Sequence, residues 1–141
     1  MAIVLNNGMA SVSSVHCLIV YVDAPREIED EAISISALLA EQILSINPNR
    51  RSLRLPVTFS KVLDGLPGNP IIKNIDVLFN PAYQVDVLTL LENAFRRKAF
   101  RLIWPGKYME GKLFYSEEGY EDYRVFDIDK YNIVCVINQE D

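Results

Sequence analysis

The chain has 141 residues, of which 50% are apolar and 23% charged, and its formal net charge is −5. These values are typical of one soluble globular domain with a buried core, and no apolar run approaches the roughly 20 residues of a membrane-spanning helix. We therefore expect a cytoplasmic protein.

The charges are unevenly distributed along the chain. Residues 23–45 carry six acids and one base, and residues 107–141 carry nine acids and four bases, whereas residues 46–106 carry nine bases and four acids. The overall acidity argues against non-specific coating of DNA, although the basic middle region could still contact phosphate or an acidic partner.

The first part of the chain predicts a lead-in, a strand and a helix. We expect residues 1–15 to form a flexible lead-in and residues 16–141 to form a single domain. Residues 16–22 form a continuous apolar run, which is typical of a strand covered on both faces. Apolar residues recur at steps of three and four between 28 and 46, which predicts one long helix with an acidic first turn.

After the first helix, predicted strands and helices alternate, and the last part of the chain predicts strands alone. Asn80 and Pro81 predict the start of a helix that runs to about residue 98. Strands are predicted at 52–57, 70–79 and 99–104, a short helical turn at 59–63, and three strand-like runs between 111 and 137. The pattern predicts an α/β fold with a mostly parallel, three-layer sheet and a C-terminal antiparallel hairpin or meander.

In such a fold the loop after the first strand is the usual cradle for a phosphate group. The pattern G-x-x-x-x-G-K-S/T falls on residues 23–30, where Asp23 and Ile28 occupy the glycine positions. Glu29 takes the lysine position and Asp30 the hydroxyl position. Two unit charges about 4 Å apart interact by roughly 4 kcal/mol at an effective dielectric constant near 20, so these acids should repel a phosphate.

The end of the third predicted strand also argues against a nucleotide site. The third strand should end in an acid that holds magnesium, but Lys73 and Asn74 stand there, and Asp76 follows beyond the expected site. Glu29 and Lys73 are therefore charge-reversed relative to a working nucleotide site. Two interpretations remain open: both side chains are solvated, or they form an ion pair where a ligand would bridge the two loops.

Five segments resemble a known family. They are "KNID" (73–76), "LFNP" (78–81), "WPG" (104–106), "GKLFY" (111–115) and "EEGYEDYR" (117–124). In this order they resemble the BrxF component of type 3 BREX phage-defence systems, a small P-loop protein. The resemblance implies a P-loop-NTPase-like fold and a role in antiviral defence, while the nucleotide residues depart from the family pattern at Glu29, Asp30 and Lys73.

No metal or cofactor site is predicted. Cys17 and Cys135 lie in apolar runs and are expected to be buried free thiols, with a disulfide as the alternative. His16 is the one histidine, which leaves too few ligands for zinc and no partner for a catalytic triad.

Two groups of residues are candidates for partner binding. Basic residues at the end of the second long helix and in the strand that follows it either face solvent or contact nucleic acid or an acidic protein: Arg96, Arg97 and Arg101. Tyrosines among the C-terminal acids either pack in the meander or form an interface, since tyrosine is enriched at binding hot spots: Tyr115, Tyr120 and Tyr123.

The sequence and the antiviral role that the resemblance implies together favour a non-catalytic accessory subunit of a bacterial antiviral complex that binds other defence proteins and has no cofactor. One alternative is an NTPase or nucleotide sensor whose site is completed by a partner. Another is an adaptor that contacts DNA through the basic middle region.

Overall fold

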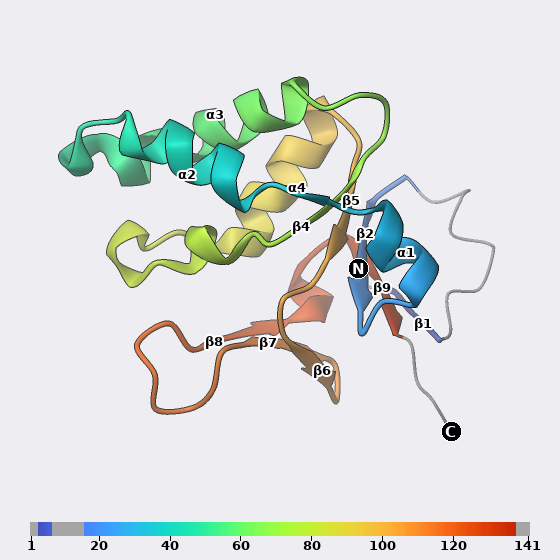
Figure 1. Ribbon diagram of the computed structural model, residues 1–141. Helices are drawn as coiled ribbons and strands as arrows, with labels where there is room; N and C mark the ends of the chain where they lie inside the picture. Colours follow the sequence, from blue (N-terminus) through green and yellow to red (C-terminus); the bar gives the residue numbers. More distant parts are fainter. Residues whose placement is uncertain (1–2, 7–15, 138–141) are drawn as a thin grey trace.

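The computed structural model describes residues 3–6 and 16–137, and its centre is a six-stranded sheet (Figure 1). All of the strand pairs in this sheet are parallel. In spatial order the strands are β1 (Ile3–Asn6), β9 (Ile133–Ile137), β2 (Leu18–Val22), β5 (Arg101–Ile103), β4 (Ile71–Lys73) and β3 (Ile33–Ser34). The expected parallel α/β fold is confirmed.

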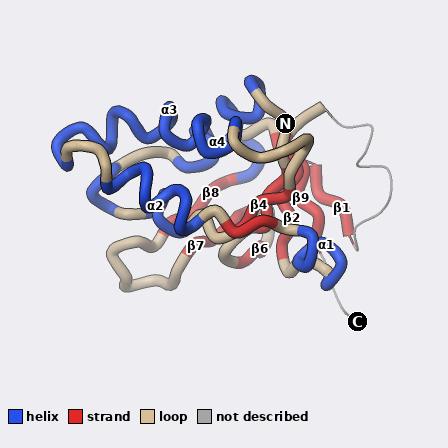
Figure 2. The backbone as a smooth tube through the Cα atoms, turned by 45° about the horizontal axis from the view of Figure 1, so that its top comes forward, coloured by secondary structure: helices blue, strands red, loops and turns tan. Residues whose placement is uncertain are grey.

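Four helices connect these strands and cover the two faces of the sheet unequally. They are α1 (Arg26–Glu31), α2 (Ser36–Leu44), α3 (Arg51–Asp64) and α4 (Val87–Arg97). The chain crosses from β2 to the edge strand β3 through α1 and then steps back through β4 to β5. Because such crossovers are right-handed, opposite directions of travel place α1 on one face and the other three helices on the opposite face (Figures 1 and 2).

Successive side chains of the central strands point to opposite faces of the sheet and belong to two separate hydrophobic clusters. In β2, Ile19 and Tyr21 belong to the cluster that packs against Ile28 of α1. Leu18 and Val20 belong to the larger cluster under α2, α3 and α4. All five residues of β2 are buried, which confirms the prediction of a strand covered on both faces.

The predicted long helix over residues 28–46 is wrong. The chain leaves α1 at Ala32 and becomes extended, and Ile33 and Ser34 form β3, paired with β4. The amide of Ile35 then donates to the carbonyl of Lys73 at 3.2 Å before α2 begins. Pairing of this short segment, which includes the β-branched Ile33, with β4 outweighs the local helical periodicity, whose apolar positions go to opposite faces of the sheet.

The predicted strand over residues 52–57 is also wrong, because this segment belongs to α3. Leu55, Phe59 and Val62 are buried at helical spacing. Pro56 lies inside the helix but on its exposed side, where water can satisfy the carbonyl that proline leaves without a donor. The short helical turn expected at 59–63 is the second half of the same helix.

The third predicted strand and the following helix are shorter than expected. β4 ends at Lys73, and Asp76–Phe79 forms a 3₁₀ turn. Asn80 does act as a cap, but of another 3₁₀ turn, and Gln84 with φ of 50° ends that turn. The helix α4 starts at Val87, where the Asp86 side chain accepts a hydrogen bond from the amide of Thr89 at 3.1 Å.

The C-terminal part contains the expected meander as a separate sheet. β6 (Lys107–Met109), β7 (Lys112–Tyr115) and β8 (Arg124–Asp127) pair antiparallel. The last strand, however, does not continue the meander: β9 enters the parallel sheet between β1 and β2 with all five residues buried. Residues 3–6 form β1 rather than part of a lead-in; residues 7–15 of that predicted segment lie outside the described residues.

The joint between the main sheet and the meander depends on Trp104 and Gly106. The Trp104 indole N–H donates to the carbonyl of Phe114 at 2.9 Å. A Cβ atom on Gly106 would lie 1.9 Å from that same carbonyl oxygen, so only glycine lets β7 approach this closely. The residues 104–106 therefore have a structural role in attaching the meander.

Aromatic packing completes this attachment. The ring of Phe79 stacks on that of Tyr115 with centroids 3.8 Å apart, and Trp104 and Phe126 meet Phe79 edge to face. These rings join the 3₁₀ turn before α4, the end of β5 and two strands of the meander. The meander is thus part of the larger hydrophobic cluster.

Candidate functional site

The candidate site lies at the carboxyl ends of β2, β5 and β4. From the neighbouring strands β2 and β5 the chain departs toward opposite sides, to β3 in one case and through the meander to β9 in the other. In open α/β sheets, ligands bind outside the carboxyl ends of the strands at such a reversal. This position is the one that the sequence assigns to the altered phosphate loop.

The loop itself offers little to a phosphate. Asp23 is exposed and has φ of 51°, and Pro25, which has no N–H group, stands directly before α1. The amides of Ile28 and Glu29 both donate to the carbonyl of Pro25 at 3.0 Å. These amides are therefore used to build the first turn of a six-residue helix.

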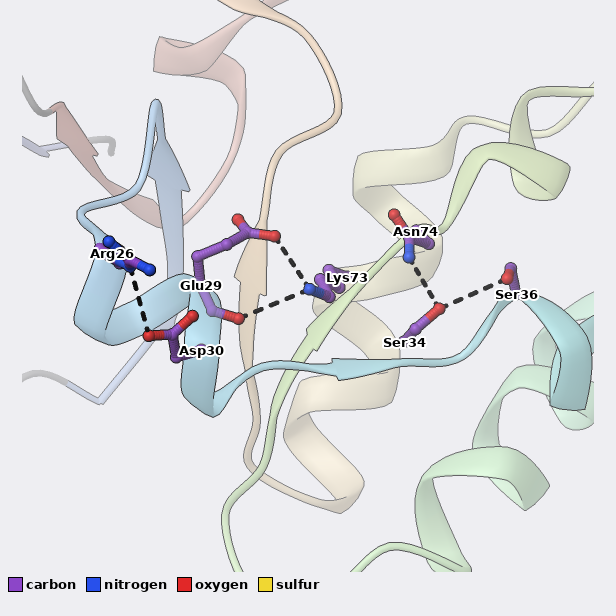
Figure 3. Close-up of polar contacts among 7 residues, drawn as sticks. All are labelled: Arg26, Glu29, Asp30, Ser34, Ser36, Lys73 and Asn74. Carbon is purple, nitrogen blue, oxygen red and sulfur yellow. Dashed lines mark hydrogen bonds and ion pairs between the residues drawn. The ribbon is translucent and has the colours of Figure 1, made fainter.

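Glu29 and Lys73 form an ion pair across the two loops, as the second interpretation of the sequence predicts (Figure 3). The Lys73 Nζ donates to Glu29 Oε1 at 2.9 Å and to the carbonyl oxygen of Glu29 at 3.5 Å. The Lys73 side chain is 26% exposed and that of Glu29 is 47% exposed. The Lys73 cation is thus already bound to an acid of the same chain.

The other altered positions have different surroundings. Ile28 packs against the sheet through the smaller hydrophobic cluster. Asp30 lies 3.8 Å from Arg26 on the outer side of α1, where both side chains are exposed. Of the five positions, only Glu29 and Lys73 meet, while Asp23 and Asp30 face solvent.

A second ion pair holds α1 on the sheet. Arg101, at the start of β5, lies 3.7 Å from Glu31 and donates to the hydroxyl of Tyr21 at 2.9 Å. Arg101 is therefore on the α1 face, away from Arg96 and Arg97 on α4. This pairing could not be predicted from the sequence, because it depends on which residues of β5 face α1.

Polar side chains next to Lys73 form a short chain that the sequence analysis missed. Asn74, with φ of 63°, donates through its side-chain amide to Ser34 Oγ at 2.7 Å. Ser34 Oγ lies 3.4 Å from Ser36 Oγ (Figure 3). The available signal was an asparagine directly after a strand, since asparagine tolerates left-handed backbone.

Asp76 does not serve this site. Its carboxylate accepts a hydrogen bond from the Tyr115 hydroxyl at 3.1 Å. Burial, together with this carboxylate, holds the pKa of Tyr115 well above its ordinary value. Tyr115 is buried against Phe79 and is therefore a core residue. It is not available as an interface tyrosine.

Of the other tyrosines near the C-terminus, some pack in the structure and some are exposed, as an interface would require. Tyr131 donates a hydrogen bond to the helix-capping carboxylate of Asp86 at 2.7 Å. The pKa of Tyr131 is raised, mainly by burial and also by this hydrogen bond. Tyr120, in contrast, is 66% exposed, and Tyr123 is half-buried in the same loop. Only these last two remain available to a partner.

Many bases of the middle region have structural partners. Arg97 forms an ion pair with Asp64 of α3. Lys98 donates to the carbonyls of Leu63 and Leu66 at the end of α3, where a cation suits the helix dipole. Arg96 donates to the side chain of Asn93 at 3.1 Å and remains exposed.

Within residues 16–137, no group of three or more His, Cys, Asp and Glu side chains is arranged to hold a metal ion. Both cysteines are buried free thiols, and burial raises the pKa of Cys135 to about 12. Across the same residues, no helix is long and apolar enough to traverse a bilayer. Comparisons with known proteins found no matching family model, curated protein or solved structure.

Proposed function

We propose that this chain is a non-catalytic accessory subunit that binds other proteins, built on a P-loop-like scaffold that has no working phosphate site. The observation that carries this proposal is the ion pair between Lys73 and Glu29 at the carboxyl ends of β4 and β2. A phosphate group at this position would have to displace the Glu29 carboxylate from Lys73 in the presence of Asp23 and Asp30.

Electrostatics support the proposal. An acid at the lysine position replaces an attraction of roughly 4 kcal/mol by a repulsion of similar size, at about 4 Å and an effective dielectric constant near 20. The dipole of a helix contributes only about 0.3–1 kcal/mol at its N-terminus, so α1 does not offset this repulsion. The site therefore favours the closed ion pair over a bound nucleotide.

The resemblance to the BrxF component of BREX systems supports the biological part of the proposal. The segment 104–106, one of those that carry the resemblance, has a defined structural role at the joint with the meander. Its retention is compatible with a scaffold that keeps its shape while its nucleotide residues differ. A cytoplasmic location in a bacterial antiviral complex is part of the same proposal.

The alternative of a DNA-contacting adaptor has less support. Of the bases in the middle region, Lys73, Arg97, Lys98 and Arg101 are engaged with acids or carbonyls of the chain itself. The exposed bases on α3 remain, but the net charge of −5 of the whole chain opposes DNA binding.

Affinity purification of the tagged chain from its native host tests the function. We expect the chain to bring down a larger defence protein at moderate salt, with the tag alone as the control. Recovery of the chain by itself, together with multiple-turnover chemistry on a small molecule, would contradict the proposal.

A further inference from the structure

A groove between α3 and α4 is lined by apolar side chains and by the cation of Lys61. Its volume is about 470 Å³. The apolar lining residues come from both helices: Pro56, Val57, Leu90 and Ala94. Lys61 lies on the rim, and the ion pair between Arg97 and Asp64 lies in the same groove.

The exposed side of α3 extends this surface. Val57 is 54% exposed, and Leu53, one turn earlier on the same side of the helix, is 83% exposed. Arg54 and Lys61 are exposed beside them and carry positive charge. A partner that covers this groove should therefore present an apolar or aromatic side chain surrounded by acids.

The loop between β7 and β8, residues 116–123, has this character. It contains four acids, which are Glu117, Glu118, Glu121 and Asp122. Tyr120 stands among them with 66% of its surface exposed, although tyrosine commonly buries its ring. The loop thus carries an aromatic anchor surrounded by negative charge.

Hydrogen bonds order this loop in advance of any contact. The amide of Tyr120 donates to the carbonyl of Glu117, and the amide of Tyr123 donates to that of Tyr120, each at 3.1 Å. Arg124 donates to the carbonyls of Glu121 and Tyr123 at 3.3 and 2.9 Å. An ordered loop loses little conformational freedom on binding, which favours its use as an interface.

We propose that the loop 116–123 of one copy docks into the α3–α4 groove of a second copy, with Tyr120 against Val57 and the acids facing Lys61 and Arg54. Within one chain the segment that connects β4 to α4 lies between the loop and α3 (Figure 1), and both Tyr120 and Val57 are exposed, so the contact forms between copies. The inference deepens the proposed function, on which it rests, by naming a second copy as a binding partner.

The contact joins two different surfaces and is therefore head-to-tail. An open assembly keeps one free groove at one end and one free loop at the other, so association continues into a ring or an open chain of subunits. Charge contributes to the attraction, and we expect association to weaken several-fold when salt rises from about 50 to about 500 mM.

Sedimentation equilibrium of the full chain, with complementary variants, tests this arrangement. The mass of the wild type should rise with concentration above the 16.1 kDa of one chain. Val57→Glu blocks the groove and Tyr120→Ser removes the anchor, so each variant alone should associate at least about tenfold more weakly. An equimolar mixture of the two should form a dimer of one copy of each, because each variant retains one intact surface.

Matched controls separate docking from general surface effects. Leu44→Glu changes another exposed apolar helix residue, on α2, and Val125→Ser changes an exposed residue of β8 outside the loop. Both controls should associate as the wild type does. A chain that stays monomeric at millimolar concentration, or a mixture that forms no dimer, would overturn the inference. Co-purification of a different defence protein would still support the proposed function in that case.

Discussion

The two faces of the parallel sheet are covered in different ways. On one face, three helices and the meander pack through a large cluster of buried apolar side chains. On the other face, α1 has six residues, none of them buried, and two ion pairs connect it to Lys73 and Arg101. The difference indicates that the first face supplies most of the stability, whereas the second determines the charge at the candidate site.

The largest expected loss of stability follows from a change on the packed face. Phe79→Ala removes the ring that contacts Trp104, Tyr115 and Phe126, and large-to-small changes of buried phenylalanine cost about 3–5 kcal/mol. Ile28→Ala on the α1 face should cost only about 1 kcal/mol, because that side chain is half-buried. Urea unfolding measures both, and equal losses would contradict the comparison.

The second effect concerns the joint of the meander. Gly106→Ala places a Cβ against the carbonyl of Phe114, and we expect a loss of about 1–3 kcal/mol in the free energy of unfolding. Gly65→Ala is the matched control, because its Cβ would have only ordinary contacts and its φ is −79°. Thermal unfolding should show a lower Tm for the first variant alone.

A smaller effect depends on pH. The folded chain holds the pKa of Tyr115 above the value of about 10 that the unfolded chain has, so the stabilisation is complete below pH 10 and is lost as pH rises further. Tyr115→Phe should cost about 1 kcal/mol at neutral pH, because it loses a hydrogen bond, and should reduce the loss of stability above pH 10. Tyr120→Phe, on the exposed loop, should leave the free energy of unfolding at neutral pH unchanged.

The smallest expected effect lies on the α1 face. Glu29→Gln and Lys73→Met should show a coupling of about 0.2–1 kcal/mol in a double-mutant cycle, as partly exposed ion pairs do. The coupling should decrease at high salt. Strict additivity at low salt would show that the two charges act independently.

Much of the packed face could be predicted from the sequence. The continuous apolar runs identify β2 and β9 as buried strands, and the spacing of Leu90, Leu91 and Ala94 identifies α4. An apolar run does not encode which strand it pairs with, and the sequence therefore predicts β9 in the meander rather than in the parallel sheet. Pro56 obscured α3, because proline inside a helix is normally unfavourable.

The candidate site could be predicted only in part, because its charges are visible in the sequence but the contacts between distant segments are not. Charges at Glu29 and Lys73 are visible in the sequence, and their reversal relative to a nucleotide site predicts the ion pair. The pairing of Arg101 with Glu31, and the place of Ser34 beside Asn74, depend on the break between α1 and α2. That break results from pairing with β4, a contact between segments about 40 residues apart in the chain.

Calorimetric titration of the wild-type chain with ATP and with GTP, in the presence of magnesium, tests the central claim most directly. The closed ion pair and the surrounding acids predict no heat of binding for either nucleotide. A dissociation constant in the micromolar range would contradict the claim that the Glu29–Lys73 ion pair and the acids around it prevent phosphate binding here.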